Sequence, residues 1–260
     1  MYHFIVFINR AKVCIGGFQD DTMKSVRLYQ NTELKVGIQI NLEKSAAHHL
    51  LKVLRFPEGQ NITLFNGDGF DYQVRVVETK KICAVEVLSC EKNQRESSLN
   101  LTLAQGIAKG EKMDFLIQKA IELGVNRIVP LQAERCVVRL SGVKLIKRTE
   151  HWQKIANHAC EQSGRSVIVE VAEAKSLAEV LSEAEGAGYV LHHRAEKGLL
   201  AMKKPSQATI LIGPEGGLSG VEIDEAIASG FQPLLLGNRT LRTETASLAA
   251  IANMQLIWGS

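Results

Sequence analysis

The sequence predicts an α/β protein built from a small β-rich domain and a larger domain with a mainly parallel sheet. Two changes of pattern lead to this prediction. Short runs that alternate apolar with polar residues fill positions 26–88, whereas strand-like runs alternate with amphipathic helices from residue 99 onward. The 260 residues, 45% apolar and 23% charged, supply enough apolar material for one or two compact cores.

The first residues form a stretch that we expect to lie outside the fold. An apolar run at 2–8 is interrupted by Asn9 and Arg10, so it is too short for a secretory signal and far below the ~20 residues of a membrane span. Met23 is a more natural start of the folded chain than Met1, and residues 1–22 are therefore interpreted as an N-terminal extension. The five cysteines are scattered and lack C-x-x-C spacing, which favours a reducing cytoplasm over a disulfide scaffold.

Residues 23–95 are predicted to form the small β-rich domain, a barrel or a sandwich. Alternating runs lie at 36–41, 61–78 and 83–88, and the cluster Asn66-Gly67-Asp68-Gly69 within the second run is typical of a hairpin turn. One helix is predicted at 44–54, because its pattern stops before the breaker Pro57.

Residues 96–260 are predicted to form the α/β domain, after a polar stretch at 91–98 that marks the boundary. Several of its strands are apolar with little alternation, as expected when helices cover both faces of a parallel sheet. The predicted strands are 99–106, 127–131, 167–171, 189–193, 209–213 and 233–237, and the predicted helices are 112–123, 144–162, 177–185, 221–229 and 244–258.

The strongest local signal is the glycine-rich turn GPEGG (213–217), which follows an apolar strand and precedes a helix. Ser219 and Glu222 form an S-x-x-E capping box, so the turn is short and lies at the carboxyl edge of the sheet, where α/β proteins bind ligands. The glycine order fits neither a dinucleotide-binding loop nor a P-loop. Missing side chains would instead allow close main-chain contact with an organic ligand, although a tight turn without any ligand is an open alternative.

A second segment, LGNRTLRTETA (236–246), repeats the order of strand, glycine, polar loop and helix. Two neighbouring strand ends are therefore expected to face one site. The helix that follows, 244–258, is apolar nearly all round, which indicates either the centre of the domain or a subunit interface.

These two segments resemble, in this order at the C-terminus, the RsmE-type ribosomal RNA methyltransferases of the SPOUT superfamily. The likeness extends over most of the chain from Met23. It includes HHLLKVLR (48–55), KGEKMDFLIQKAIELGV (109–125), the stretch through ERCVVR (134–139), and ACEQSGR (159–165). Only the first 22 residues depart from the pattern.

The resemblance implies a SPOUT-type α/β domain with a C-terminal trefoil knot, preceded by a small PUA-like β-barrel that helps to bind RNA. It also implies a homodimer that transfers a methyl group from S-adenosylmethionine to N3 of one uridine in 16S rRNA of the small ribosomal subunit. The residues that should enclose the cofactor, by matching position, are Leu191, His192, Ile212, Gly213, Pro214, Glu215, Gly216, Gly217, Leu236, Gly237, Leu241, Arg242 and Thr245.

The implied chemistry needs a positioned uracil that loses its N3 proton, because the neutral nitrogen is a poor nucleophile. Arg242 is the candidate to stabilise the developing uracil anion. Glu215 and Glu244 are the candidate general bases, and the choice between them stays open. A carboxylate in the first turn of a helix, such as Glu244, is also commonly a simple dipole or capping contact.

The net charge of +3 is too small to identify an RNA-binding protein, but basic residues cluster locally. The candidates for RNA contact, several of them by resemblance, are Arg27, Arg55, Lys109, Lys112, Arg135, Arg139, Lys147, Arg148, Gln162 and Arg165. An ordinary solvated face is the alternative for the run at 135–154.

No metal site is predicted, because the pairs His48-His49 and His192-His193 lack the spacing and partner carboxylate of known zinc motifs.

Two other functions stay open at this point. One is a SPOUT enzyme with another rRNA or tRNA target, and the other is a non-catalytic RNA-binding protein of ribosome assembly.

Overall fold

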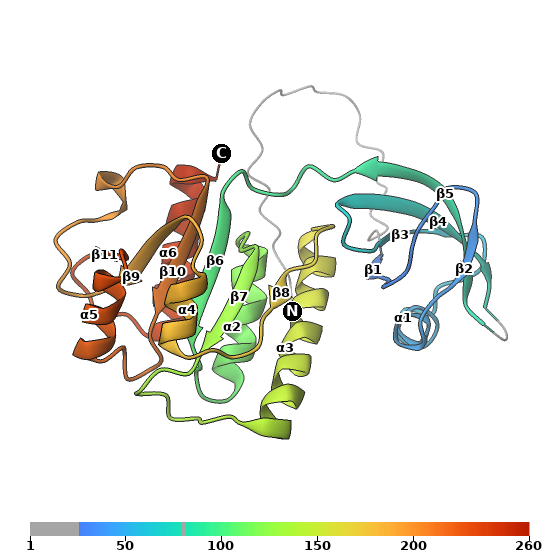
Figure 1. Cartoon of the computed structure of the whole chain (residues 1–260). Coiled ribbons are helices and arrows are strands. Elements are labelled where there is room, and N and C mark those ends of the chain that lie inside the picture. The colour runs from blue at the N-terminus through green and yellow to red at the C-terminus, as the bar shows by residue number, and fades with distance from the viewer. Residues whose placement is uncertain (1–25, 80–81, 260) are drawn as a thin grey trace.

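The computed structural model describes residues 26–79 and 82–259, and the expected extension at 1–22 lies outside them. The first domain contains one five-stranded sheet (Figure 1). Its strands are β1 (Arg27–Tyr29), β2 (Gln39–Asn41), β3 (Asn61–Phe65), β4 (Phe70–Glu78) and β5 (Ala84–Lys92), arranged in the order β1-β3-β4-β5-β2. The pairs β3–β4, β4–β5 and β2–β5 are antiparallel, whereas β1 pairs with β3 in parallel.

The predicted hairpin turn joins β3 to β4, and its glycines explain why it can form. Gly67 and Gly69 have φ angles of 98° and 89°, which side chains other than glycine rarely adopt. The predicted single helix is in fact two consecutive helical segments, α1 (Lys44–His48) and a π-helical turn, η1 (His49–Val53). Apolar periodicity cannot distinguish an α-helical turn from a π-helical one, so the sequence missed this change.

The second domain is built on a six-stranded sheet in which every pair is parallel, as the strand composition predicted. Its strands are β6 (Asn100–Gly106), β7 (Arg127–Leu131), β8 (Glu170–Val171), β9 (Ala187–Leu191), β10 (Gln207–Ile212) and β11 (Gln232–Leu234), in the order β11-β9-β10-β6-β7-β8. The edge strands β8 and β11 are shorter than predicted, because few of their residues find a partner at the edge of the sheet.

Helices cover both faces of this sheet, which confirms the predicted layering (Figure 1). They are α2 (Glu111–Glu122), α3 (Gly142–Ser163), α4 (Leu177–Glu183), α5 (Gly220–Ala228) and α6 (Thr243–Trp258), with a short 3-10 turn, η2 (Leu199–Ala201). Helix α2 packs between α3 and α6, and α4 and α5 lie against β7 and β9 on the other face. The central strands β6 and β10 are almost entirely buried between the two helical layers.

The C-terminal chain crosses the sheet after its edge strand. Beyond β11, the N–H of Leu235 donates to the carbonyl of Lys197 at 3.0 Å, beside a parallel bridge between Gly198 and Leu235. Helix α6 then packs against η2, β10 and α2. The segment after β11 therefore contacts the loop between β9 and β10 before it reaches the centre of the domain. The trefoil knot itself stays a prediction from the family resemblance.

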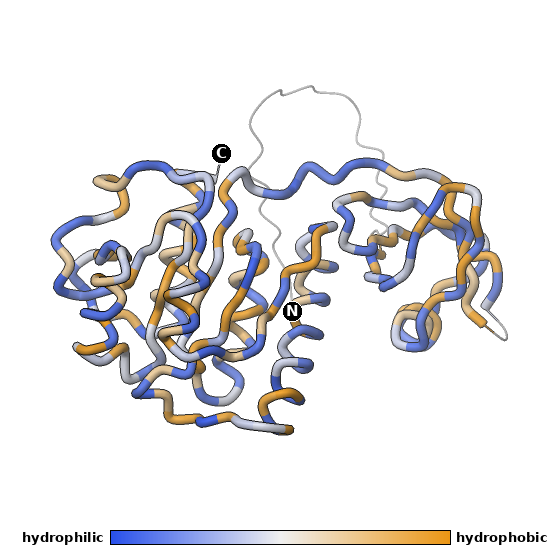
Figure 2. The backbone as a smooth tube through the Cα atoms, in the orientation of Figure 1, coloured by the Kyte–Doolittle hydropathy of each residue, from blue (hydrophilic) through white to orange (hydrophobic). Residues whose placement is uncertain are grey.

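The two domains have separate apolar cores and a polar connection between them. The segment that joins β5 to β6 is hydrophilic over most of its length (Figure 2). Within residues 26–79 and 82–259, no helix combines the length and the apolar character that a membrane crossing requires.

Candidate active site

A cleft with a volume of about 780 Å³ lies at the carboxyl ends of β9, β10 and β11. Lys112 of α2 and three segments line it: 191–193 at the end of β9, 212–218 at the end of β10, and 234–246 from the end of β11 to the first turn of α6. Parallel strands bring these ends together at one edge of the sheet. Of the residues predicted to enclose a cofactor, all line the cleft except Thr245, whose side chain is exposed.

The glycine turn after β10 has its shape fixed by close main-chain packing. A Cβ atom on Gly213 would lie 2.5 Å from the backbone nitrogen of Leu218, and one on Gly106 would lie 2.3 Å from the nitrogen of Pro214. No side chain fits at either position. The predicted capping box is present, since the Ser219 hydroxyl accepts from the Glu222 N–H and the Glu222 carboxylate accepts from the Ser219 N–H. The turn therefore ends firmly at the start of α5.

A buried polar cluster joins this turn to the start of α6, and the sequence did not predict it. Gln105, at the end of β6, is fully buried and donates through Nε2 to the Thr243 hydroxyl at 3.0 Å. The Thr243 hydroxyl donates to the Gly213 carbonyl at 2.6 Å, and Ser247 donates to the Oε1 atom of Gln105 at 2.5 Å. A glutamine directly after the apolar residues Leu103 and Ala104 is the one signal that could have drawn attention to Gln105.

Glu215 serves the internal structure of the turn. Its Oε1 atom accepts from the Lys109 N–H at 3.0 Å and lies 3.5 Å from the ammonium nitrogen of Lys112. Burial raises the pKa of the Glu215 carboxyl, but these donors outweigh burial and hold the pKa below the usual 4.5. A carboxylate that is already satisfied in this way is a weak proton acceptor.

Glu244 differs from Glu215 in its surroundings. It lines the cleft from the first turn of α6, and its Oε2 atom is buried without a hydrogen-bond partner among the described residues. A buried polar atom without a partner is costly, so a bound group that donates an N–H there would be favoured. Arg242 lines the same cleft with an exposed side chain that has no ion pair or hydrogen bond in the described chain.

The histidine pair lies at the wall formed by the end of β9. The rings of His192 and His193 are 5.0 Å apart and nearly perpendicular. Burial is the largest cause that lowers the pKa of His192, and the nearby His193 and Arg194 add to it. The imidazole therefore lines the cleft as a neutral group at neutral pH. Among the described residues, no three His, Cys, Asp or Glu side chains are grouped so as to hold a metal ion.

The comparisons with known proteins agree with this geometry. Family models match residues 95–255 as an RNA methyltransferase domain and residues 42–88 as an RNA methyltransferase PUA domain. The ribosomal RNA small subunit methyltransferase E of Buchnera aphidicola (strain Sg) is 33% identical over 90% of this chain and 96% of its own. That of Bacillus subtilis is also 33% identical, over 79% of this chain and 85% of its own. This chain belongs to the ribosomal RNA small subunit methyltransferase E family.

Solved structures extend the match of this methyltransferase E chain to three dimensions. The family member from Neisseria gonorrhoeae bound to S-adenosyl methionine has a TM-score of 0.85 and 39% identity, over 90% of this chain and 98% of that one. A putative methyltransferase from Legionella pneumophila in complex with the cofactor has a TM-score of 0.88 and 38% identity, over 91% and 99% of the two chains. The PUA-like domain followed by an α/β methyltransferase domain, as predicted from the sequence, is thus confirmed.

Several basic residues predicted to contact RNA lie close to the cleft of this methyltransferase E chain. Lys112 lines the cleft, and Lys109 holds Glu215 through its backbone. Arg135 donates to the carbonyls of Gly216 and Leu218 at 3.2 and 3.3 Å. These contacts join the loop after β7 to the glycine turn.

The other RNA candidates divide between exposed positions and internal ones. Arg139, Lys147, Gln162 and Arg55 are exposed, and the guanidinium of Arg148 lies 5.8 Å from the ring centre of the buried Trp152.

Two of these candidates have side chains engaged in internal contacts, and their contact with RNA stays a prediction. Arg165 is only 4% exposed, because its guanidinium pairs with Glu96 at 2.5 Å and donates to the carbonyls of Ile121 and Val125. The Arg27 guanidinium forms an ion pair with Asp71, with 2.9 Å between Nη2 and Oδ1, where the two domains meet.

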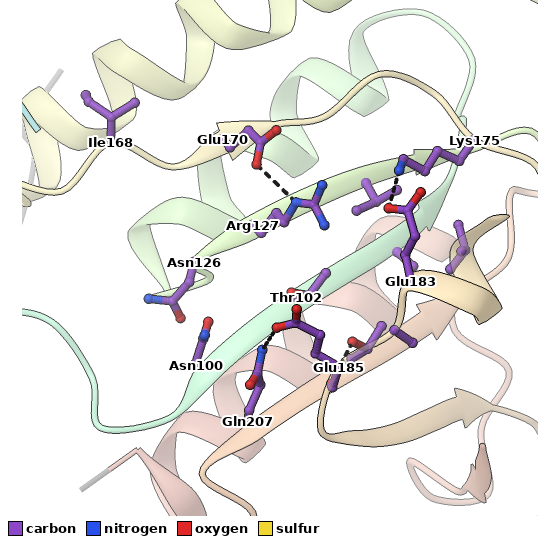
Figure 3. Close-up of a pocket in the computed structure, with 15 residues that line it drawn as sticks. Asn100, Thr102, Asn126, Arg127, Ile168, Glu170, Lys175, Glu183, Glu185 and Gln207 are labelled. Carbon is purple, nitrogen blue, oxygen red and sulfur yellow. Dashed lines mark hydrogen bonds and ion pairs between the residues drawn. The ribbon is translucent and has the colours of Figure 1, made fainter. Parts of the chain in front are cut away.

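A second cavity of about 360 Å³ lies at the opposite edge of the sheet, beside α4 (Figure 3). Its charged side chains are paired with one another. Arg127 contacts Glu170 at 3.1 Å, Gln207 donates to Glu185 at 2.6 Å, and Lys175 forms an ion pair with Glu183. Because its charged side chains have partners within the chain, this cavity gives no indication of a charged ligand.

Proposed function

We propose that this protein transfers a methyl group from S-adenosylmethionine to N3 of one uridine in the 16S rRNA of the small ribosomal subunit. The observation that carries the proposal is the cleft at three neighbouring strand ends, in a chain that matches methyltransferase E relatives along nearly its whole length. An assembled small subunit is an alternative form of the same substrate.

The cleft suits a folded nucleoside cofactor. Its lining is largely main chain at the glycine turn and at Gly237, so amide and carbonyl groups are accessible where side chains are missing. Residues 191–193, 212–217 and 236–241 would hold S-adenosylmethionine. That group, when bound, supplies an electrophilic methyl on a sulfonium centre.

The chain itself has to orient the uracil and take its N3 proton. The buried Oε2 atom of Glu244, which has no partner, supports Glu244 as the proton acceptor. Glu215 is less suited, since Lys109 and Lys112 already satisfy its carboxylate. Arg242, a cation at the same cleft without an internal partner, would stabilise negative charge on a uracil oxygen as the proton leaves.

We also infer that the protein works in the cytoplasm as a homodimer. Helix α6 is apolar on most sides, yet Leu256 is 79% exposed in the single chain. An exposed large apolar side chain on a helix that leads directly from the cofactor cleft favours a second copy as the partner. The exposed basic residues Arg55, Arg139 and Lys147 would contact the RNA backbone.

Primer extension across the small-subunit rRNA tests the proposed function, because a methyl group on uracil N3 blocks base pairing and stops the polymerase. We expect a stop in cells that carry this protein, its loss in a deletion strain and its return on complementation. A stop that persists in the deletion strain would refute the target. Calorimetry that detects no binding of S-adenosylmethionine at millimolar concentration would instead favour a non-catalytic RNA-binding role.

A further inference from the structure

A polar cluster connects the two domains at the C-terminal end of α3. Arg27, on β1, donates to Asp71 on β4 and to the Ser166 hydroxyl, both at 2.9 Å. Ser166 also donates to the Asp71 carboxylate. Asn93 completes the cluster, with donations to Asp71 at 3.0 Å, to the Gly164 carbonyl at 2.9 Å and to Ser166 at 3.0 Å. Each residue of this cluster therefore either forms a hydrogen bond between the two domains or forms one with a residue that does.

Further contacts between the two domains surround this cluster. Phe65, at the end of β3, is fully buried and belongs to the apolar core of the larger domain. Tyr29 packs on its ring at 5.7 Å between centroids, and the Tyr29 N–H donates to Glu161 on α3 at 2.8 Å. The Gly69 N–H donates to the Ser166 carbonyl at 3.1 Å. The hairpin of the small domain is thus seated on the end of α3.

The covalent linker does not by itself provide such a seat. Residues 93–98 are hydrophilic and form no helix or strand (Figure 2). Arg95 contacts both domains, since its guanidinium donates to the Gly164 carbonyl at 3.1 Å and lies 3.8 Å from the Asp71 carboxylate. The relative direction of the two domains is therefore set by the noncovalent contacts.

Helix α3 connects this contact between the domains with the region of the cofactor cleft. Its 22 residues span about 33 Å, from the loop that holds the glycine turn to the small domain. An RNA bound by both domains has to fit the angle at which the small domain is seated. A change at the far end of α3 would displace RNA bound to the small domain without altering the cleft.

We propose that segment 161–166 is the joint that sets the direction of the PUA-like domain relative to the cofactor cleft, with Asp71 and Ser166 as positioning residues for the RNA substrate. The inference rests on the proposed function for its RNA, but the joint itself is independent of catalysis. It also gives the ACEQSGR segment a role other than the RNA contact that the sequence suggested for Arg165.

The charge of Asp71 is central to this joint. Burial raises the pKa of its carboxyl, but hydrogen bonds from Arg27, Ser166 and Asn93 together outweigh burial and lower it. Asp71→Asn would place an amide donor where the carboxylate now faces only donors. Ser166→Ala would remove the hydroxyl that both Arg27 and Asn93 use. Glu91→Gln is the matched control, since Glu91 is paired with Asp71 across the strands but is exposed and outside the cluster.

The first measurement is limited trypsin digestion, because Lys92 and Arg95 lie in and beside the linker. We expect Asp71→Asn and Ser166→Ala to be cut there about tenfold faster than the wild type and Glu91→Gln, since a lost hydrogen bond to a charged group opens the joint by about that factor. Small-angle scattering should show a wider distribution of molecular dimensions for the same two variants.

The second measurement is methylation kinetics. For both joint variants we expect the KM for rRNA to rise about tenfold, with kcat at saturating RNA and the affinity for S-adenosylmethionine within about twofold of the wild type. Equal linker cleavage and equal KM for all four proteins would overturn the proposal. So would loss of cofactor affinity in Ser166→Ala, because the cleft would then depend on the joint. A wild type that binds the cofactor but methylates no rRNA would refute the proposed function, while the cleavage assay would still decide on the joint.

Discussion

The side-chain amide of Gln105 donates to the hydroxyl of Thr243 at 3.0 Å, in the buried space between the end of β6 and the start of α6. Through this contact the two turns that line the cofactor cleft share one hydrogen-bond network. Thr243 in turn donates to the carbonyl of Gly213. The relative position of the glycine turn and of α6 is therefore fixed by a residue that does not line the cleft.

Replacing Gln105 with leucine should weaken cofactor binding. The hydroxyl groups of Thr243 and Ser247 would lose a buried partner, at a cost of about 1–3 kcal/mol for each group left unsatisfied. We expect the Kd for S-adenosylmethionine, measured by calorimetry, to rise by about tenfold or more. The control Gln162→Leu, at an exposed position on α3, should leave this Kd unchanged. Equal affinities for the two variants would contradict the role of Gln105.

Two glycine-to-alanine substitutions only seven residues apart should differ sharply. A Cβ atom on Gly213 would lie 2.5 Å from the nitrogen of Leu218, so Gly213→Ala should cost about 1–3 kcal/mol of unfolding free energy and abolish measurable cofactor binding. Nothing lies within 4 Å of a Cβ on Gly220, and Gly220→Ala should be neutral or slightly stabilising. Denaturant titration and calorimetry on both variants check this, and a tolerant Gly213 would mean that the turn is not tightly packed.

The parts of the site that sequence could predict are those fixed by local chemistry. The Ser219–Glu222 capping box depends on residues three positions apart, and the glycine turn follows directly from a buried strand. Such short-range patterns fix the carboxyl edge of a parallel sheet as the location of the cleft.

The remaining parts depend on partners that are distant in the chain. Gln105 and Thr243 are 138 positions apart, so no window of sequence contains both. Arg165 has the composition of a surface cation, but the fold brings Glu96 and two main-chain carbonyls onto it. Tertiary contacts decide that Arg165 is buried whereas Arg139 is exposed. The pattern of charges along the sequence cannot distinguish two such arginines.

Arg242→Ala should separate chemistry from binding. Because its guanidinium has no partner within the described chain, its removal should leave the fold and the affinity for S-adenosylmethionine largely intact. Loss of a group that stabilises charge in the transition state should lower the single-turnover rate by roughly 10²–10³-fold. Arg239 lies in the same loop and lines the same cleft, so Arg239→Ala tests whether any nearby cation can stabilise the charge of the transition state. An unchanged rate for Arg242→Ala would exclude it from catalysis.

The Glu215 carboxylate should stabilise the protein in a pH-dependent way. Its pKa is below the usual 4.5 in the folded chain, so its contribution is complete above about pH 4.5 and is lost as the pH falls through the lowered value. We expect Glu215→Gln to cost about 1 kcal/mol at pH 7. The difference from the wild type should shrink toward zero as the pH falls below the lowered pKa of Glu215. Urea titrations of both proteins at several pH values measure this difference, and a constant difference would mean that the charge of Glu215 is not involved.

Leu256→Lys should break the proposed homodimer without unfolding the chain. The leucine is 79% exposed in the single chain, so its replacement removes little internal packing. If a second copy covers it, each lost leucine contact costs about 2 kcal/mol, and the dimer Kd should rise at least thirtyfold. Sedimentation across a range of concentrations measures this, with Leu54→Lys, an exposed leucine of the small domain, as the control. A dimer of undiminished affinity in Leu256→Lys would show that α6 does not form the interface. A dimer lost together with methylation, but with the fold retained, would show that each cleft needs the second copy for its activity.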